Sequence, residues 1–168
     1  PESGMDQKLE QLDLVALVHK VSIDWVPKAL DKNIDLGVKC QLNNLMINGN
    51  SLLLQELLNN LIDNAIRYNQ AGAIITVSLN LRKNEAVLSV QDDGVGIAIK
   101  DQEKVFERFY RVFGSNENGC GLGLAIVREI ANQHHASVAL GYSDIKHGRG
   151  TLVTVRFKLA NNQAGLSR

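Results

Sequence analysis

One stretch of the sequence, residues 51–69, constrains the fold more than any other. It reads SLLLQELLNNLIDNAIRYN, and its apolar residues recur at three- and four-residue steps, the period of an α-helix. The apolar positions form one stripe: Leu54, Leu57, Leu58, Leu61, Ile62 and Ala65. Ser51 is the predicted N-cap. A helix with a single apolar stripe buries that stripe against another layer, so this stretch predicts a layered fold.

The rest of the chain supplies strands for the second layer. Residues 11–33 predict another amphipathic helix, with Asp13 as its N-cap and Pro27 expected to kink or end it. A short helix is predicted around residues 99–106, a polar glycine-containing stretch at 113–120, and a further helix after Gly121. Strand patterns occupy residues 34–40, 74–81, 86–91, 137–140 and 151–157, with a short apolar piece at 45–47. We therefore expect an α+β sandwich, with helices on one face of a mixed, mostly antiparallel sheet.

Composition limits what the chain can bind and where it can reside. Its 168 residues, 45% of them apolar, suit one globular domain. Eighteen basic and eighteen acidic residues cancel, which argues against a nucleic-acid partner. No apolar run approaches the roughly 20 residues needed to cross a bilayer, so this piece is expected to be soluble. It starts PESGMDQK without an initiator methionine, which indicates a fragment of a longer protein.

Polar residues of the 51–69 helix gather on one face. Glu56, Asn60, Asn64 and Arg67 lie about 120° around the helix from the apolar stripe. A solvated polar face is one interpretation. Asparagine is nonetheless a poor residue for a helix interior, and two of them lie one turn apart. The second interpretation is that the amide oxygens bind a hard cation and the guanidinium binds phosphate.

A second polar site follows a strand in VLSVQDDGVGI. The apolar run ends in Asp92, and Gly94 and Gly96 then turn the chain. Asp-Gly is a common turn pair, so a plain turn is one interpretation. The other is that a carboxylate fixed at the strand end accepts hydrogen bonds from an exocyclic amino group. The later GRG of HGRGTLVTVRF is a weaker signal of the same kind.

Three glycines at alternate positions, Gly119, Gly121 and Gly123, precede the predicted helix in NENGCGLGLAIVREIANQHH. This run lacks the lysine and serine or threonine of a phosphate-loop NTPase, and it has no strand before it as a dinucleotide fingerprint requires. The signature set of eukaryotic protein kinases is also missing. What remains is a glycine-rich loop leading into a helix N-terminus, where unpaired N–H groups favour the approach of a phosphate chain.

Together these stretches resemble a known family. NNLIDNAIRY resembles the N box, DDGVGI the first glycine box, FERFYR the F box, GCGLGLAIV the second glycine box and GRGT the third. They occur in the order found in the catalytic ATP-binding domains of bacterial sensor histidine kinases, and the resemblance covers about residues 12–158. It implies a Bergerat-type (GHKL-type) α/β sandwich that binds ATP and Mg²⁺, with a mobile lid from about Tyr110 to Asn118.

Residue by residue, the resemblance implies a metal site, a base site and a lid. Asn64 matches the magnesium ligand, and Asn60 matches its neighbour in the phosphate pocket. Arg67 stands where the family usually has lysine. Asn60 and Arg67 are both candidate catalytic residues. Asp92 matches the carboxylate that reads adenine. The other residues expected around the nucleotide base are Tyr68, Gly94, Gly96, Ile97 and Thr151.

The lid residues follow from the same resemblance. Phe106 and Phe109 are expected to anchor the lid, and Arg108 and Arg111 to reach the phosphates. The lid hinge and the start of the following helix are expected at Gly119, Gly121, Leu122, Gly123 and Leu124. Two features depart from the pattern: HHAS stands where His-Gly-Gly is more usual, and Cys120 replaces a commoner threonine or serine.

Related folds leave other functions open. ATP-hydrolysing clamps in chaperones, gyrases and mismatch-repair proteins carry a glutamate one turn before the magnesium asparagine, and here that position is Asn60. A neutral amide cannot act as a general base, so transfer to an outside nucleophile is favoured over hydrolysis. An anti-sigma-type serine kinase and a non-catalytic nucleotide sensor remain alternatives.

None of the four histidines, His19, His134, His135 and His147, lies in the His-Glu/Asp-x-x-x-Pro context of a phosphoacceptor helix, and each is expected to be a surface or core residue. We therefore expect residues 1–11 to be a linker remnant, 12–160 the catalytic domain and 161–168 a flexible tail. The expected partners are a dimerisation/phosphoacceptor domain of the same parent protein and a response regulator. The fragment is expected to be a monomer, and the full protein a homodimer with this domain in the cytoplasm and an anchor in the inner membrane.

Overall fold

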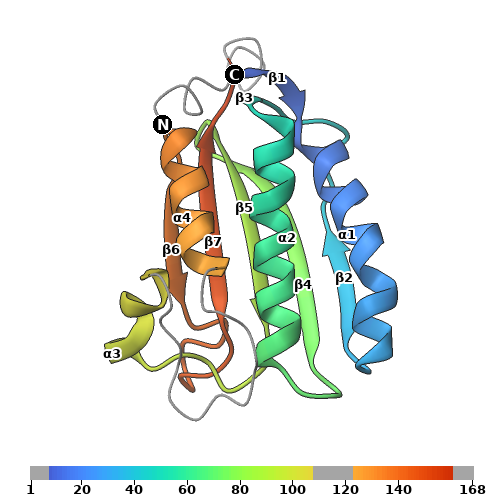
Figure 1. Ribbon diagram of the computed structural model, residues 1–168, viewed down its shortest axis with the longest axis vertical. Helices are drawn as coiled ribbons and strands as arrows, with labels where there is room; N and C mark the ends of the chain where they lie inside the picture. Colours follow the sequence, from blue (N-terminus) through green and yellow to red (C-terminus); the bar gives the residue numbers. More distant parts are fainter. Residues whose placement is uncertain (1–7, 108–122, 161–168) are drawn as a thin grey trace.

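The computed structural model describes residues 8–107 and 123–160, and in this part the chain forms two layers (Figure 1). One layer is a five-stranded sheet in the order β2-β4-β5-β7-β6. Its strands are β2 (Asp35–Lys39), β4 (Ile74–Arg82), β5 (Glu85–Asp92), β6 (Ser137–Gly141) and β7 (Leu152–Lys158). Only the β2–β4 pair is parallel among these neighbours. The α+β class with a mixed, mostly antiparallel sheet is thus confirmed.

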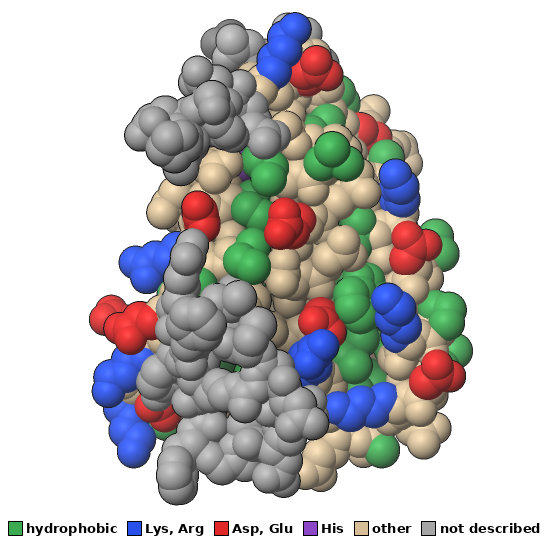
Figure 2. Space-filling view, in the orientation of Figure 1, with side chains coloured by type: hydrophobic (Ala, Val, Ile, Leu, Met, Phe, Trp, Pro, Cys, Tyr) green, Lys and Arg blue, Asp and Glu red, His purple; other side chains and the backbone are tan. Residues whose placement is uncertain are grey.

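Three helices cover one face of the sheet: α1 (Leu14–Asp31), α2 (Ser51–Tyr68) and α4 (Gly123–Gln133) (Figure 1). The predicted short helix consists of two single turns, α3 (Ile99–Gln102) and the 3₁₀ turn η2 (Lys104–Phe106). On the helical face, acidic and basic side chains are interspersed, as expected from the balanced composition (Figure 2). Within the described residues, no helix combines the length and apolar character that a membrane span requires.

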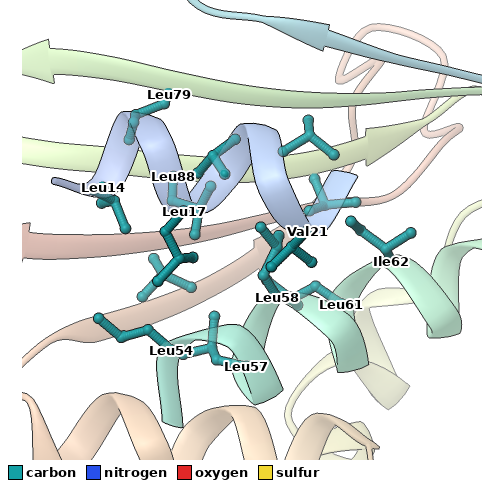
Figure 3. Close-up of a cluster of buried hydrophobic side chains, with 14 of the residues drawn as sticks. Leu14, Leu17, Val21, Leu54, Leu57, Leu58, Leu61, Ile62, Leu79 and Leu88 are labelled. Carbon is teal, nitrogen blue, oxygen red and sulfur yellow. The ribbon is translucent and has the colours of Figure 1, made fainter. Parts of the chain in front are cut away.

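The apolar stripe of α2 forms the centre of the core. Leu54, Leu57, Leu58 and Ile62 are 0–1% exposed, and they face side chains of α1, β4 and β5 such as Leu17, Leu79 and Leu88 (Figure 3). Burying one such side chain stabilises the fold by about 1.5–3 kcal/mol. Ala65 is only half-buried at the edge of the stripe, and the next residue, Ile66, is buried instead.

A second, two-stranded sheet joins β1 (Glu10–Asp13) to β3 (Met46–Gly49), with Glu10 opposite Gly49. The sequence predicted an apolar piece at β3 but no strand at β1, because EQLD shows no alternation and forms a strand only through its partner. Glu10 and Gln11 fall in the segment that was predicted to precede the domain.

The predicted N-cap of α2 was wrong, and α1 does not end at Pro27. Asn50, and not Ser51, caps α2, because its side chain accepts the N–H of Leu53 at 3.0 Å. Helix α1 runs through Pro27 to Asp31. Pro27 removes one N–H donor to the carbonyl of Ile23, but both residues lie on the exposed side, where water can take the place of that donor. The predicted Asp13 cap is present, with its Oδ1 accepting the N–H of Val15 at 3.0 Å.

Candidate nucleotide-binding site

The polar face of α2 meets the start of α4. Asn60 and Asn64 are half-buried, whereas Glu56 and Arg67 are exposed. The Asn64 side chain lies against Gly123, where an added Cβ would be 2.8 Å from Oδ1 and 2.9 Å from Nδ2. Glycine at 123 therefore leaves the room that Asn64 occupies. Because Gly123 is the first residue of α4, the Asn64 amide lies beside a helix N-terminus with unpaired backbone N–H groups.

This arrangement fits a phosphate chain with its magnesium ion. A helix N-terminus favours anions, and Mg²⁺ in such sites is held by one or two protein oxygens plus phosphate oxygens. Asn64 offers one hard amide oxygen at that place. The fit comes from the chemistry of the donor and from the space that a Cβ at residue 123 would fill.

Asp92 lies at the end of β5 with a fixed orientation. The residue is 8% exposed, and its Oδ1 accepts the backbone N–H groups of Gly94 at 2.9 Å and Thr151 at 3.1 Å. Within the described chain, no donor is bonded to Oδ2. One carboxylate oxygen is thus bonded to the backbone, and the other can still accept a hydrogen bond.

The β6–β7 loop holds the backbone around Asp92. Ser143 Oγ donates a 2.6 Å hydrogen bond to the Asp92 carbonyl, and the Gly150 N–H donates one of 2.8 Å to the Gly94 carbonyl. Gly150 has a φ of +71°, and an added Cβ would overlap Ser143 Oγ. The GRG signal, weak in the sequence, thus marks a close backbone contact with the turn at Asp92 and Gly94.

Tyr142 packs beside the same turn. Gly96 has a φ of +84°, and a Cβ there would lie 3.1 Å from the Tyr142 ring and 2.9 Å from the Gly150 carbonyl. A side chain at 96 would therefore be strained and would meet both the ring and the backbone. Sequence reasoning placed neither Tyr142 nor Ser143 in the site, because nothing in the local pattern marks them.

The exposed loop beyond Ser143 has its own ion pair. His147 Nδ1 bonds Asp144 Oδ2 at 2.8 Å, and this side-chain hydrogen bond is the main reason why the pKa of Asp144 is lowered from its ordinary value. His134 is different, because it is buried between the carbonyl of Ile130, bonded to Nδ1 at 2.8 Å, and the N–H of Asn50, which donates to Nε2 at 3.0 Å. It is the satisfied core histidine that was expected.

Several predicted residues lie at the edge of this site. Arg67 bonds both carboxylate oxygens of Asp63 at 3.0 Å through its Nε, so in this structure it is held along α2. Tyr68 is 42% exposed. Ile97 and Leu124 are half-buried, and the Ile97 carbonyl accepts a bond from Gln102 Nε2 at 2.9 Å. Their contacts with a nucleotide remain predictions.

The F-box stretch contacts α4 through an aromatic ring. The Arg128 guanidinium carbon lies 5.6 Å from the centre of the Phe106 ring, and the neighbouring Val105 is buried. Phe106 thus ties η2 to the helix that begins at Gly123. The other predicted lid and phosphate residues lie outside the described residues: Arg108, Phe109, Arg111, Gly119, Cys120, Gly121 and Leu122.

Asn69, the residue after α2, was also missed. It is 7% exposed, its Nδ2 donates to the Ala65 carbonyl at 2.7 Å, and its Oδ1 faces Gly94, where an added Cβ would overlap it. The C-terminal turns of α2 therefore contact both α4, through Asn64, and the Asp92–Gly94 turn, through Asn69. Asparagine is common just after a helix, so nothing in the sequence marked residue 69.

Comparison with known proteins shows which family the chain belongs to. The family model of the histidine kinase-, DNA gyrase B-, and HSP90-like ATPases matches residues 49–161, more than half of the chain. The sensor protein kinase PmrB of Pseudomonas aeruginosa is 36% identical over 140 residues, which are 81% of this chain and 29% of PmrB. The chain thus spans less than a third of the length of that relative.

Two solved structures share the fold over most of the chain. The mycobacterial sensor histidine kinase MprB superposes with a TM-score of 0.77 at 26% identity, over 90% of this chain and 99% of that one. Full-length ShkA in complex with AMPPNP gives a TM-score of 0.78 at 25% identity, over 90% of this chain and 31% of ShkA. The chain therefore belongs to the histidine kinase-, DNA gyrase B- and HSP90-like ATPases, as an ATP-binding domain of the kind found in sensor histidine kinases.

Proposed function

We propose that this domain binds Mg-ATP between α2, α4 and the end of β5, and presents the γ-phosphate to a histidine on a dimerisation/phosphoacceptor domain of the same parent protein. The observation that supports this most is the placement of the Asn64 amide against Gly123 at the N-terminus of α4. It puts a metal-binding oxygen where a phosphate chain is favoured.

The proposed roles follow from the fixed orientations. Asp92 Oδ2 accepts a hydrogen bond from the exocyclic amino group of adenine, because Oδ1 is already bonded to two backbone N–H groups. Asn64 binds the magnesium ion through its amide oxygen, and Asn60 lines the phosphate pocket one turn earlier. When bound, Mg²⁺ supplies positive charge against the phosphate oxygens. Arg67, Arg108 and Arg111 are proposed to add further positive charge there.

Transfer is favoured over hydrolysis because the site offers water no base at the Asn60 position. Asn60 Nδ2 donates to the Glu56 carbonyl at 2.8 Å, so the amide is held along the helix. A neutral amide takes up no proton at neutral pH, whereas efficient hydrolysis needs a group that accepts the proton of the attacking water. An imidazole supplied by another domain brings its own nucleophilic nitrogen.

The proposal extends to the parent protein. The full-length protein is proposed to be a homodimeric, membrane-anchored sensor that passes its phosphoryl group to a response regulator. Within the described residues, His134 is buried and bonded at both ring nitrogens, which leaves it unsuited as an acceptor.

The test is transfer in trans. The domain is incubated with γ-labelled ATP and Mg²⁺, alone and with the phosphoacceptor domain of its parent. We expect acid-labile label on a histidine of the added domain and little label or free phosphate without it. Phosphoserine on the partner would indicate a serine kinase, and rapid phosphate release would indicate an ATPase. ATP binding without either product would indicate a nucleotide sensor. Each of these results would overturn the proposal.

A further inference from the structure

Asn69 is held so that its amide oxygen points away from its own helix. Its Nδ2 donates a 2.7 Å hydrogen bond to the Ala65 carbonyl in the last turn of α2. This bond fixes the amide plane and directs Oδ1 toward the Asp92–Gly94 turn, where a Cβ added at Gly94 would overlap it. The same Cβ would lie 3.2 Å from Asp92 Oδ1. The Asn69 amide oxygen and the Asp92 carboxylate therefore both lie beside Gly94.

That amide oxygen lacks a partner yet is open to the outside. Between residues 8 and 107 and between 123 and 160, no donor is bonded to Asn69 Oδ1. In the same part of the chain, Ser22 Oγ is the one side-chain nitrogen or oxygen that is both cut off from solvent and unpaired. Asn69 is 7% exposed and its Oδ1 is not among the atoms cut off from solvent, so a small part of that oxygen is open. A nearly buried acceptor without a donor is costly unless a ligand or water supplies one.

We propose that Asn69 is a second base-specificity residue, whose Oδ1 accepts a hydrogen bond from the exocyclic amino group of adenine beside Asp92. This inference rests on the proposed ATP site. An exocyclic amino group has two hydrogens. Asp92 Oδ1 is already bonded to the N–H groups of Gly94 and Thr151, so the turn offers two acceptors, Asp92 Oδ2 and Asn69 Oδ1. Guanine carries an oxygen at the corresponding ring position, and that oxygen would face two acceptors instead of one.

The experiment is a double-mutant cycle in which the Asn69 side chain and the amino group of the nucleotide base are removed singly and together. Dissociation constants of ATP and of purine riboside 5′-triphosphate, which lacks the amino group, are measured by calorimetry with Mg²⁺ for the parent and for Asn69→Ala. We expect Asn69→Ala to weaken ATP about three- to tenfold, the range for one neutral hydrogen bond, and to leave the purine analogue unchanged. Equal weakening of both nucleotides, or of neither, would overturn the inference.

A second variant separates base reading from the helix end. The hydroxyl of Asn69→Ser can still donate to the Ala65 carbonyl, but it is too short to place an acceptor at Gly94. We expect it to lose the amino-group preference as fully as Asn69→Ala while it melts at the temperature of the parent. Asn80→Ala, an exposed amide on β4, is the matched control and should leave the cycle unchanged. If the parent binds neither nucleotide, the proposed function itself fails, which is a different result from equal affinities.

Discussion

The side chain of Asn64 lies directly against the α-carbon of Gly123, with room for no Cβ between them, since that atom would be 2.8 Å from Oδ1. The position of the Asn64 amide on α2 therefore depends on the absence of a side chain at the first residue of α4. A Cβ at residue 123 would displace that amide.

Gly123→Ala should weaken Mg-ATP binding without weakening the fold. The added methyl group displaces the Asn64 amide, and changes of this kind beside a metal ligand cost roughly 10–100-fold in metal affinity. Alanine is a better helix former than glycine, so α4 loses nothing in propensity. Calorimetry with Mg-ATP and a thermal melt measure the two effects. Gly37→Ala is the control, because nothing lies within 4 Å of a Cβ there, and an equal effect in both variants would contradict the assignment.

Asn64→Ala should abolish measurable phosphoryl transfer. The variant lacks the amide oxygen that we assign to the metal, and magnesium tolerates little departure from its octahedral set of oxygens. ATP affinity is compared with and without Mg²⁺ for parent and variant. We expect that Mg²⁺ raises the ATP affinity of the parent but not that of the variant. A variant that binds Mg-ATP as tightly as the parent would show that Asn64 is not the magnesium ligand.

Asp92→Ala should remove the preference for adenine. In the parent, we expect the carboxylate to accept a hydrogen bond from the amino group of adenine and to repel the oxygen of guanine. A hydrogen bond to a charged group contributes about 1.5–3 kcal/mol. ATP should therefore bind the parent at least about tenfold more tightly than GTP. Competition binding measures this ratio, and equal affinities for ATP and GTP in the parent would rule out the role of Asp92.

Sequence patterns predicted the elements that depend on near neighbours. The α2 stripe, the Asp13 cap and the strands of the main sheet follow from periodicity and local chemistry, and all are present. The N-cap of α2 was misplaced by one residue because Asn50 and Ser51 are both good caps, and only the bond to the Leu53 N–H distinguishes them. β1 was missed because its four residues form a strand only when β3 is beside them.

The parts of the site that were missed rest on contacts between distant residues. Ser143 reaches the Asp92 carbonyl from 51 positions away, and Asn69 meets Gly94 across the gap between helix and sheet. Single serines and asparagines in loops are common, and nothing near them in the sequence distinguishes these two. In contrast, Asn64, Asp92 and Gly123 were predicted as site residues because each lies in a stretch whose residue types are unusual for its secondary structure.

Asn60→Glu should convert the site toward hydrolysis. The substitution places a carboxylate one turn before Asn64, where a general base can accept the proton of an attacking water, and such a base contributes typically 10²–10⁴-fold to a rate. Asn60 is half-buried on the face that carries Asn64, and glutamate, which is one methylene longer, extends from the same face of the helix. We expect phosphate release from ATP to rise at least tenfold relative to Asn60→Gln, the control that has the length of glutamate but no charge.

The rate of phosphate release is measured for both variants at matched ATP saturation. If Asn60→Glu releases phosphate no faster than Asn60→Gln, then the identity of residue 60 does not decide between transfer and hydrolysis, and another feature of the site holds water away from the γ-phosphate.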